Sequence, residues 1–168
     1  MFNKIDQLSE TEFTEVFGNI FENASWISEK LYVQKPFKNF NNLSEKMISI
    51  FGDANNQNKL KILKSHPDLA DKTKIASLTE DSNKEQSHAG LNHCTEDEFI
   101  EFKNLNLKYK NKFGFPFIIA VTGKKKLEIL DIFKKRILNS KEIEFNEAVK
   151  QVKQIANLRL GLLKIKFL

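Results

Sequence analysis

Signals that start helices recur along this 168-residue chain, and the alternation typical of half-buried strands is almost absent. Ser9 with Glu12 and Thr95 with Glu98 have the spacing of a capping box, in which each residue's side chain bonds the other's backbone. Apolar residues at intervals of three and four follow each pair. Because a helical period does not suit a sheet, these signals predict an all-α protein.

The same signals predict a single-domain bundle of about eight or nine helices over residues 1–168. No solenoid-length repeat and no Pro/Gly/Ser-rich linker divides the chain. Pro67 disfavours helical geometry in the residue before it, so one helix should end near His66. Gly114 is the natural end of the helix that Thr95 begins. The helices expected from these signals cover residues 9–20, 23–34, 42–51, 57–65, a short stretch from 82, 95–113, 122–139 and 142–163.

Cysteine, histidine and apolar runs exclude several classes. A lone cysteine, Cys94, excludes an internal disulfide framework and a zinc module built from several cysteines. His88 and His93 are five residues apart and face different ways on a helix, which disfavours a zinc site. The longest apolar run, Phe115–Val121, is far shorter than the roughly 20 residues that cross a bilayer. The N-terminus lacks a signal-peptide layout, and the C-terminus does not match the Ser-Lys-Leu peroxisomal address. We therefore expect a cytoplasmic protein with no metal and no membrane span.

Lysine supplies nearly all of the positive charge. The chain has 27 Lys and Arg against 22 Asp and Glu, for a formal charge of +5, and only Arg136 and Arg159 are arginine. The charge and the Lys124–Lys126 run permit a nucleic-acid-binding module, but scarce arginine and the lack of an Arg/aromatic stripe disfavour one. Arg136 follows two lysines, and we expect it to be a surface or structural residue.

Arg159 lies on the apolar stripe of the last expected helix, four residues after Ile155 and four before Leu163. One interpretation is that its stem packs at the edge of the stripe while its guanidinium reaches water. The other is that the guanidinium points into a pocket and binds an anionic ligand. Periodicity alone favours the first interpretation.

Two polar features have a similar double interpretation. One face of the short polar helix carries residues at i, i+3, i+4 and i+7: Ser82, Glu85, Gln86 and Ala89. This face is either solvated behind a serine cap, which the pattern alone favours, or part of a ligand site. His66 either caps carbonyls at a helix end or presents an imidazole, with a pKa near ~6.5, as a general acid or base.

The segment Phe115–Val121 is unusual in a helical protein because it is apolar throughout and follows Phe113-Gly114. The simpler interpretation is a buried connector that places aromatic rings in the core. A buried irregular segment must still satisfy its N–H and C=O groups. The alternative is therefore a segment whose backbone binds a ligand.

Four segments occur in an order and spacing that resemble one enzyme family. They are His66-Pro67-Asp68-Leu69-Ala70, Ser82-x-x-Glu85-Gln86-x-x-Ala89-Gly90-Leu91, Asn106-x-x-Tyr109-x-x-Lys112-Phe113-Gly114-Phe115-Pro116-Phe117-Ile118 and Arg159-Leu160. Phe21-Glu22-Asn23-Ala24-x-Trp26 and Lys35-Pro36-Phe37 are also similar. The resemblance is to 2-oxo-4-hydroxy-4-carboxy-5-ureidoimidazoline (OHCU) decarboxylase, an enzyme of urate breakdown. One departure is Asp71, where the family commonly has glycine, and Asp tolerates a left-handed turn better than most residues do.

The resemblance implies a helical-bundle carboxy-lyase that needs no metal or organic cofactor. It implies that the protein converts OHCU to (S)-allantoin and carbon dioxide, usually as a homodimer, in a pathway with urate oxidase and hydroxyisourate hydrolase. A related scaffold acting on another ureide acid is the main alternative. The nucleic-acid module is a more remote one.

The resemblance also implies roles for individual residues. His66 would protonate the product stereospecifically, with Glu85, Gln86 and Arg159 completing the catalytic set. The substrate-binding residues would be Pro67, Ser82, Phe117, Ile118, Ile119, Ala120 and Val121. In this arrangement the irregular Phe-Gly-Phe-Pro-Phe segment lines the site.

Overall fold

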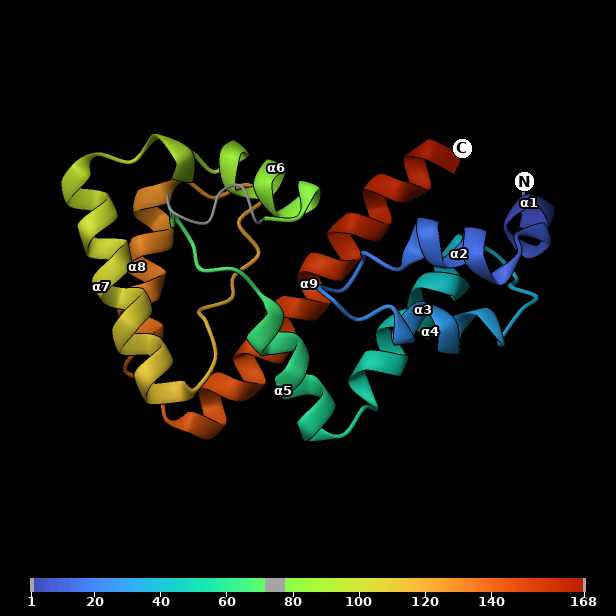
Figure 1. Ribbon diagram of the computed structural model, residues 1–168, viewed down its shortest axis with the longest axis horizontal. Helices are drawn as coiled ribbons and strands as arrows, with labels where there is room; N and C mark the ends of the chain where they lie inside the picture. The colour runs from blue at the N-terminus through green and yellow to red at the C-terminus, as the bar shows by residue number, and fades with distance from the viewer. Residues whose placement is uncertain (1, 72–77, 168) are drawn as a thin grey trace. The chain divides into compact units, whose positions relative to one another are not determined.

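The computed structural model describes residues 2–71 and 78–167, and every regular element in those ranges is helical, as the capping signals predicted (Figure 1). The chain divides into two compact units. One contains Met1–Ser65 together with Val152–Leu168, and the other contains His66–Gln151.

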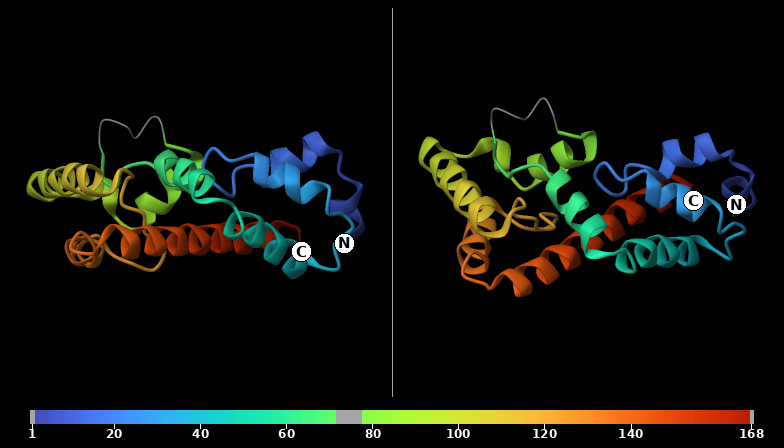
Figure 2. Two further views of the ribbon diagram at one scale, coloured as in Figure 1. Left: turned by 90° about the horizontal axis from the view of Figure 1, so that it is seen from below. Right: turned by 60° about the horizontal axis from the view of Figure 1, so that its bottom comes forward.

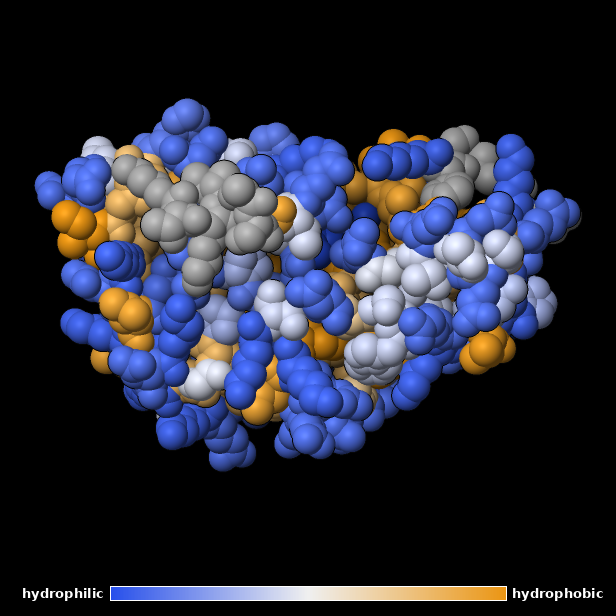
Figure 3. Space-filling model, in the orientation of Figure 1, coloured by the Kyte–Doolittle hydropathy of each residue, from blue (hydrophilic) through white to orange (hydrophobic). Residues whose placement is uncertain are grey.

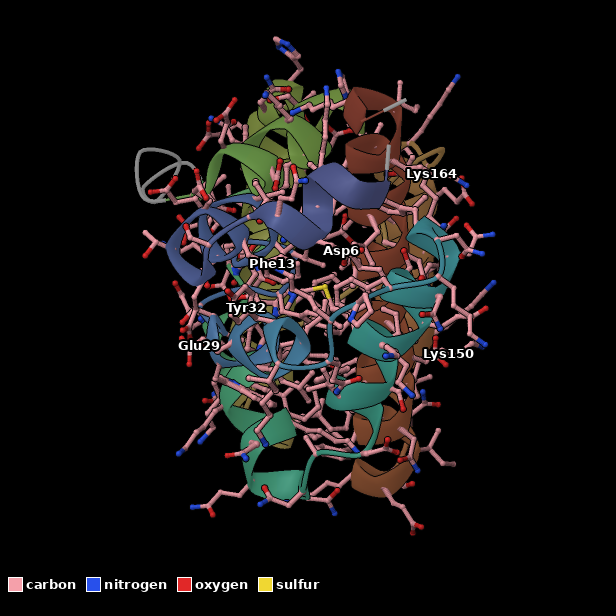
Figure 4. The ribbon with its side chains drawn as sticks, turned by 90° about the vertical axis from the view of Figure 1, so that its right-hand side faces the viewer. Asp6, Phe13, Glu29, Tyr32, Lys150 and Lys164 are labelled. Carbon is pink, nitrogen blue, oxygen red and sulfur yellow. The ribbon has the colours of Figure 1, made fainter. Side chains whose placement is uncertain are left out.

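The first unit has an aromatic core. Phe13 and Phe17, one turn apart on the same helix, have ring centroids 4.5 Å apart, and Phe13 also contacts Tyr32 at 5.6 Å. Figure 4 shows Phe13 and Tyr32 on neighbouring helices, with Glu29 at the outside. The helices of this unit are α1 (Phe2–Gln7), α2 (Glu10–Phe17), α3 (Trp26–Tyr32), α4 (Phe40–Gly52), α5 (Asn56–Ser65) and the second part of α9 (Lys141–Phe167).

The second unit is built on α7 (Glu96–Phe113) and α8 (Lys126–Arg136), which lie side by side in both views (Figures 1 and 2). Before them come α6 (Glu80–His88) and the short 3-10 helix η2 (Leu91–His93), and the first part of α9 follows. Lys126 at the start of α8 pairs with Glu98 of α7 at 2.7 Å. The Lys124–Lys126 run therefore leads into a helix start.

Both predicted capping boxes are present. Ser9 and Glu12 bond each other's backbone, and so do Thr95 and Glu98. The hydrogen bond from Lys126 and that from the Thr95 N–H lower the pKa of the Glu98 carboxyl. Gly114 ends α7 with a φ of 80°, in the left-handed region that favours glycine.

Several predicted helix boundaries were wrong. In two cases a capping residue three positions earlier in the chain starts the helix. Asn39, not Asn42, caps α4, and its side chain accepts from the backbone N–H of Asn42. Thr79, not Ser82, caps α6. The segment after Thr122 forms a turn, so α8 begins only at Lys126, while α9 continues four residues beyond its expected end. The elements α1 and η2 were not predicted.

The surface is mainly polar on the face drawn in Figure 3, where apolar residues form separate patches. No helix in the part of the chain that the structure describes is long and apolar enough to cross a membrane.

Candidate active site

His66 opens a tight turn directly after α5. The helix ends at Ser65, as the following Pro67 predicted. His66 and Pro67 are half-buried, while Asp68 is buried. Ala70 has a φ of 54°, a left-handed conformation that costs free energy in any residue other than glycine. Such a turn persists only where its surroundings hold it.

Side chains from α6 and α7 hold this turn. Gln86 Oε1 accepts from the Ala70 N–H at 3.1 Å, and Gln86 Nε2 donates to the Asp68 carbonyl at 3.4 Å. Asn106 Nδ2 donates to the Leu69 carbonyl at 3.0 Å. Lys110 Nζ lies 2.6 Å from the Asp68 carboxylate. Three consecutive residues of the turn are therefore bonded to two helices, which limits the positions open to His66.

The predicted polar face of α6 points into the unit. Ser82, Gln86 and Ala89 are buried, and Glu85 is half-buried. The solvated-face interpretation, with Ser82 as the helix cap, is therefore wrong. Residues 68–70 are not helical, so their backbone groups need partners from elsewhere. Gln86 supplies two of these partners, which explains why the polar face turns inward.

The segment Phe115–Val121 is buried throughout and forms no strand, which confirms the buried connector. In Figures 1 and 2 it passes close to the 66–71 segment in each view. Its Ile118 carbonyl accepts from Arg136 Nη1 at 2.7 Å, and its Ala120 N–H donates to Gln151 Oε1 at 2.9 Å. Among the described residues, the N–H and C=O of Ile119 have no hydrogen-bond partner. The two bonds therefore leave Ile119 unpaired between them, and the Phe117 backbone and the Ile118 N–H likewise have no partner among the described residues.

Arg159 is buried in the first unit, so its predicted reach into water is wrong. Its Nη2 lies 3.0 Å from Glu22 Oε1, and the two side chains are 4% and 2% exposed. Its Nη1 donates to the carbonyls of Asn19 and Ile20 at 3.3 and 3.4 Å. Burial is possible because a carboxylate neutralises the guanidinium and two backbone carbonyls accept from its Nη1.

Arg136 is structural and buried rather than at the surface. It pairs with Glu144, whose side chain is 0% exposed. Sequence reasoning gave no role to Glu22 or Asn106, although both stood within the quoted family segments. Glu144 gave no signal at all, because an acidic residue in the first turn of a helix ordinarily indicates only a favourable helix dipole.

The remaining candidates are peripheral. His88 and His93 are exposed, and Cys94 is a half-buried free thiol that donates to the Leu91 carbonyl at 3.4 Å.

A model of the OHCU decarboxylase family matches residues 6–161. The chain belongs to this family. It is 33% identical over 156 residues to the OHCU decarboxylase of Halalkalicoccus jeotgali, covering 93% of this chain and 87% of that protein. It is 41% identical over 157 residues to the "Uric acid degradation bifunctional protein" of Bacillus sp. (strain TB-90), covering 94% of this chain. The chain spans only 31% of the length of that bifunctional protein.

Solved structures agree with the sequence relatives. A crystal structure of (S)-allantoin synthase superposes with a TM-score of 0.76 at 26% identity, over 97% of this chain and 54% of that one. A crystal structure of OHCU decarboxylase in the presence of (S)-allantoin shares the fold, with a TM-score of 0.69 at 21% identity, over 93% of this chain and 98% of that one.

Proposed function

We propose that this member of the OHCU decarboxylase family converts OHCU to (S)-allantoin and carbon dioxide in urate degradation. The observation that carries the proposal is the match of the family model across residues 6–161, which includes His66 on its clamped turn. That match runs through both compact units, which supports treating residues 1–168 as one functional domain.

The reaction breaks the bond between the substrate ring and its carboxylate. Carbon dioxide leaves, and the electron pair of that bond stays on the ring, where adjacent unsaturated groups delocalise it. A proton must then reach the former carboxylate carbon from one face to give a single stereoisomer. The protein must therefore place an acid on one side of the ring, and it must stabilise the negative charge that develops.

His66 is the proposed acid. Histidine is the side chain that ordinarily holds and releases a proton near neutral pH, which suits it to this role. The clamped turn fixes the face from which the proton arrives, and Pro67 lines the site beside it. Glu85, half-buried on α6, orients His66 or accepts from the substrate hydroxyl.

The amide groups of the substrate are bound by amide groups of the protein. Gln86 has two N–H donors and two acceptor lone pairs, and the turn uses one of each. The remaining donor and lone pair can bind the ureido group, with Ser82 adding a hydroxyl. Within the Phe117–Val121 backbone, the Ile119 N–H can stabilise an oxyanion on the ring because no described residue occupies it.

Arg159 is the proposed binder of the substrate's negative charge. Its guanidinium is held in one orientation by Glu22 and by two backbone carbonyls. A preoriented guanidinium loses little entropy when it binds an anion, which suits it to this task better than a flexible lysine.

The partners are also proposals. We expect a homodimer in the cytoplasm that receives substrate made by urate oxidase and hydroxyisourate hydrolase. Two relatives, the "Uric acid degradation bifunctional protein" of Bacillus sp. (strain TB-90) and the "Uric acid degradation bifunctional protein PucL" of Bacillus subtilis (strain 168), support a place in urate degradation. Gel filtration and cell fractionation test the dimer and the location.

The decisive experiment follows urate oxidation by the two upstream enzymes, with circular dichroism to detect (S)-allantoin. Wild-type protein should accelerate its formation well above the spontaneous rate. His66→Asn should abolish that acceleration while leaving the far-UV spectrum unchanged, because asparagine cannot donate the proton. His88→Asn is the matched control, since His88 is an exposed histidine outside the site.

Two results would contradict the proposal. A His66→Asn variant with the wild-type rate would remove His66 from the mechanism. A wild-type protein that leaves OHCU decay unchanged but consumes another cyclic ureide acid would favour the alternative substrate.

A further inference from the structure

A buried polar cluster in the second unit has no part in the proposed chemistry. The Glu144 carboxylate lies at its centre. Arg136 Nε and Nη2 donate to Glu144 Oε1 at 3.0 and 2.5 Å, and the Tyr109 hydroxyl donates to the same oxygen. Asn139 Nδ2 donates to the other oxygen at 2.8 Å. Four hydrogen bonds thus hold a side chain that is 0% exposed.

The other end of the Arg136 guanidinium reaches the Phe115–Val121 connector. Its Nη1 donates to the Ile118 carbonyl at 2.7 Å, and its carbon Cζ lies 4.5 Å from the centroid of the Phe117 ring. That ring stacks on Phe133 of α8 with centroids 3.8 Å apart and planes 8° from parallel. Arg136 therefore bonds the connector's backbone at Ile118 and contacts the side chain of the preceding residue, Phe117.

A second hydrogen bond holds the Phe115–Val121 connector two residues further along the chain. Gln151 of α9 accepts from the Ala120 N–H at 2.9 Å. A neighbouring strand in a sheet holds residues i and i+2 in the same way, leaving the residue between them to face the other side. Ile119 is that residue, and among the described residues its N–H and C=O have no partner.

We propose that Arg136, held by Glu144, is a positioning residue that aims the Ile119 backbone at the substrate. Arg136 and Glu144 themselves do not touch the substrate. This inference rests on the proposed function, in which the Ile119 N–H stabilises the ring oxyanion. A planar fork is needed because one guanidinium must bond a carboxylate and a carbonyl in fixed directions, whereas an ammonium group has no fixed plane.

If the Arg136–Glu144 pair served only stability, apolar residues could replace it. Buried ion pairs contribute little net stability compared with apolar residues of similar size. Fixing one conformation of a backbone segment is a separate task, which misplacement by a fraction of an ångström would defeat. The two roles therefore differ in what they predict for kinetics at equal stability.

The test compares Arg136→Lys with wild type in the coupled urate assay, at a temperature at which both are fully folded. Because the ring oxyanion is absent from the bound substrate and develops only as carbon dioxide leaves, kcat and kcat/KM should fall together, by about tenfold or more, with KM little changed. Faster amide hydrogen exchange in a peptide covering residues 115–123 should accompany the loss. Glu144→Gln, which keeps the acceptor oxygen but removes the charge, should give a smaller loss of the same kind, and it serves if the lysine variant fails to fold.

Leu130→Ala is the matched control for lost stability. Leu130 is a buried residue of the same helix, and its aliphatic side chain makes no hydrogen bond or ring contact with the connector. Its variant should keep the wild-type kcat at the assay temperature despite a lower melting temperature. The inference is overturned if Arg136→Lys keeps the wild-type kcat, or if Leu130→Ala loses as much activity at equal stability. If wild type itself fails to form (S)-allantoin, the proposed function and this inference fall together, whereas an active wild type with an unchanged Arg136→Lys overturns only the inference.

Discussion

The Glu22–Arg159 pair allows a stability prediction whose size follows from its geometry. The charged atoms are 3.0 Å apart, and both side chains are at least 96% buried. At an effective dielectric constant of about 20, their attraction is on the order of 5 kcal/mol. Glu22→Gln removes this attraction but keeps an acceptor for the guanidinium, and the Asn19 and Ile20 carbonyls remain. We therefore expect a loss of about 3 kcal/mol, at the lower end for breaking a buried pair.

The fluorescence of Trp26 can measure this loss of stability in the compact unit that contains the Glu22–Arg159 pair. It is the only tryptophan, and it begins α3 in the same compact unit as Glu22 and Arg159. Urea titrations followed by its fluorescence report on that unit, and far-UV circular dichroism reports on the whole chain. For a chain of this length, about 3 kcal/mol corresponds to a fall in Tm of roughly 6–12 °C.

A double-mutant cycle tests the cause of the loss. Glu22→Gln and Arg159→Met each leave one polar partner buried, so the double variant should lose about 2–3 kcal/mol less than the sum of the two. High salt should not weaken this coupling, because buried charges are poorly screened. Glu80→Gln is the control. It removes an exposed ion pair with Lys84, so the urea midpoint should stay unchanged. A Glu22→Gln variant that loses under about 1 kcal/mol, or a coupling that disappears at high salt, would refute the reasoning.

Two further predictions concern the second unit. Burial, with added support from the hydrogen bond to Glu144, raises the pKa of the Tyr109 phenol. The folded state then keeps its proton where the unfolded state loses it, so stability is full below pH ~10 and falls by about 1.4 kcal/mol per pH unit above it. Urea titrations from neutral to alkaline pH should show this slope in wild type but not in Tyr109→Phe, and equal slopes would contradict it. Asn106→Leu should change stability by less than about 1 kcal/mol, because the unpartnered Asn106 Oδ1 disappears along with the bond to Leu69. It should nevertheless lower kcat in the coupled assay by loosening the turn that carries His66, and an unchanged kcat would show that Gln86 and Lys110 hold that turn without Asn106.

The helices were predictable where local chemistry determines them. The capping boxes at Ser9 and Thr95 and the glycine after α7 depend on residues within four positions of each other, and all three were confirmed. The starts of α6 and α8 were misjudged because several residues nearby are able to cap, and the choice depends on what the helix packs against. The direction of the α6 polar face could not be read from its period, because an inward polar face and a solvated one have the same spacing.

The partners of buried charges were beyond prediction for a different reason. Glu22 lies 137 residues from Arg159, and Asn106 lies 37 residues from Leu69. Nothing within a helical turn of either residue indicates such a partner, since it is chosen by the tertiary fold. The family resemblance named the segments and their candidate residues but not the contacts that those residues make with one another. The roles proposed for His66, Glu85, Gln86 and Arg159 stay predictions until the variants are measured.

The two arginines have the same arrangement in different units. Each bonds a buried glutamate on one side and a backbone carbonyl on another, Glu144 and Ile118 for Arg136, Glu22 and Ile20 for Arg159. Lysine, with a compact ammonium and no fixed plane, serves the exposed surface of the same chain. Both arginines therefore occur where one cation holds irregular backbone and a carboxylate together. For Arg136 that holding is the whole proposed role. For Arg159 it would prepare the proposed substrate binding, since a guanidinium already fixed by Glu22 is able to bind a small anion without reorganising.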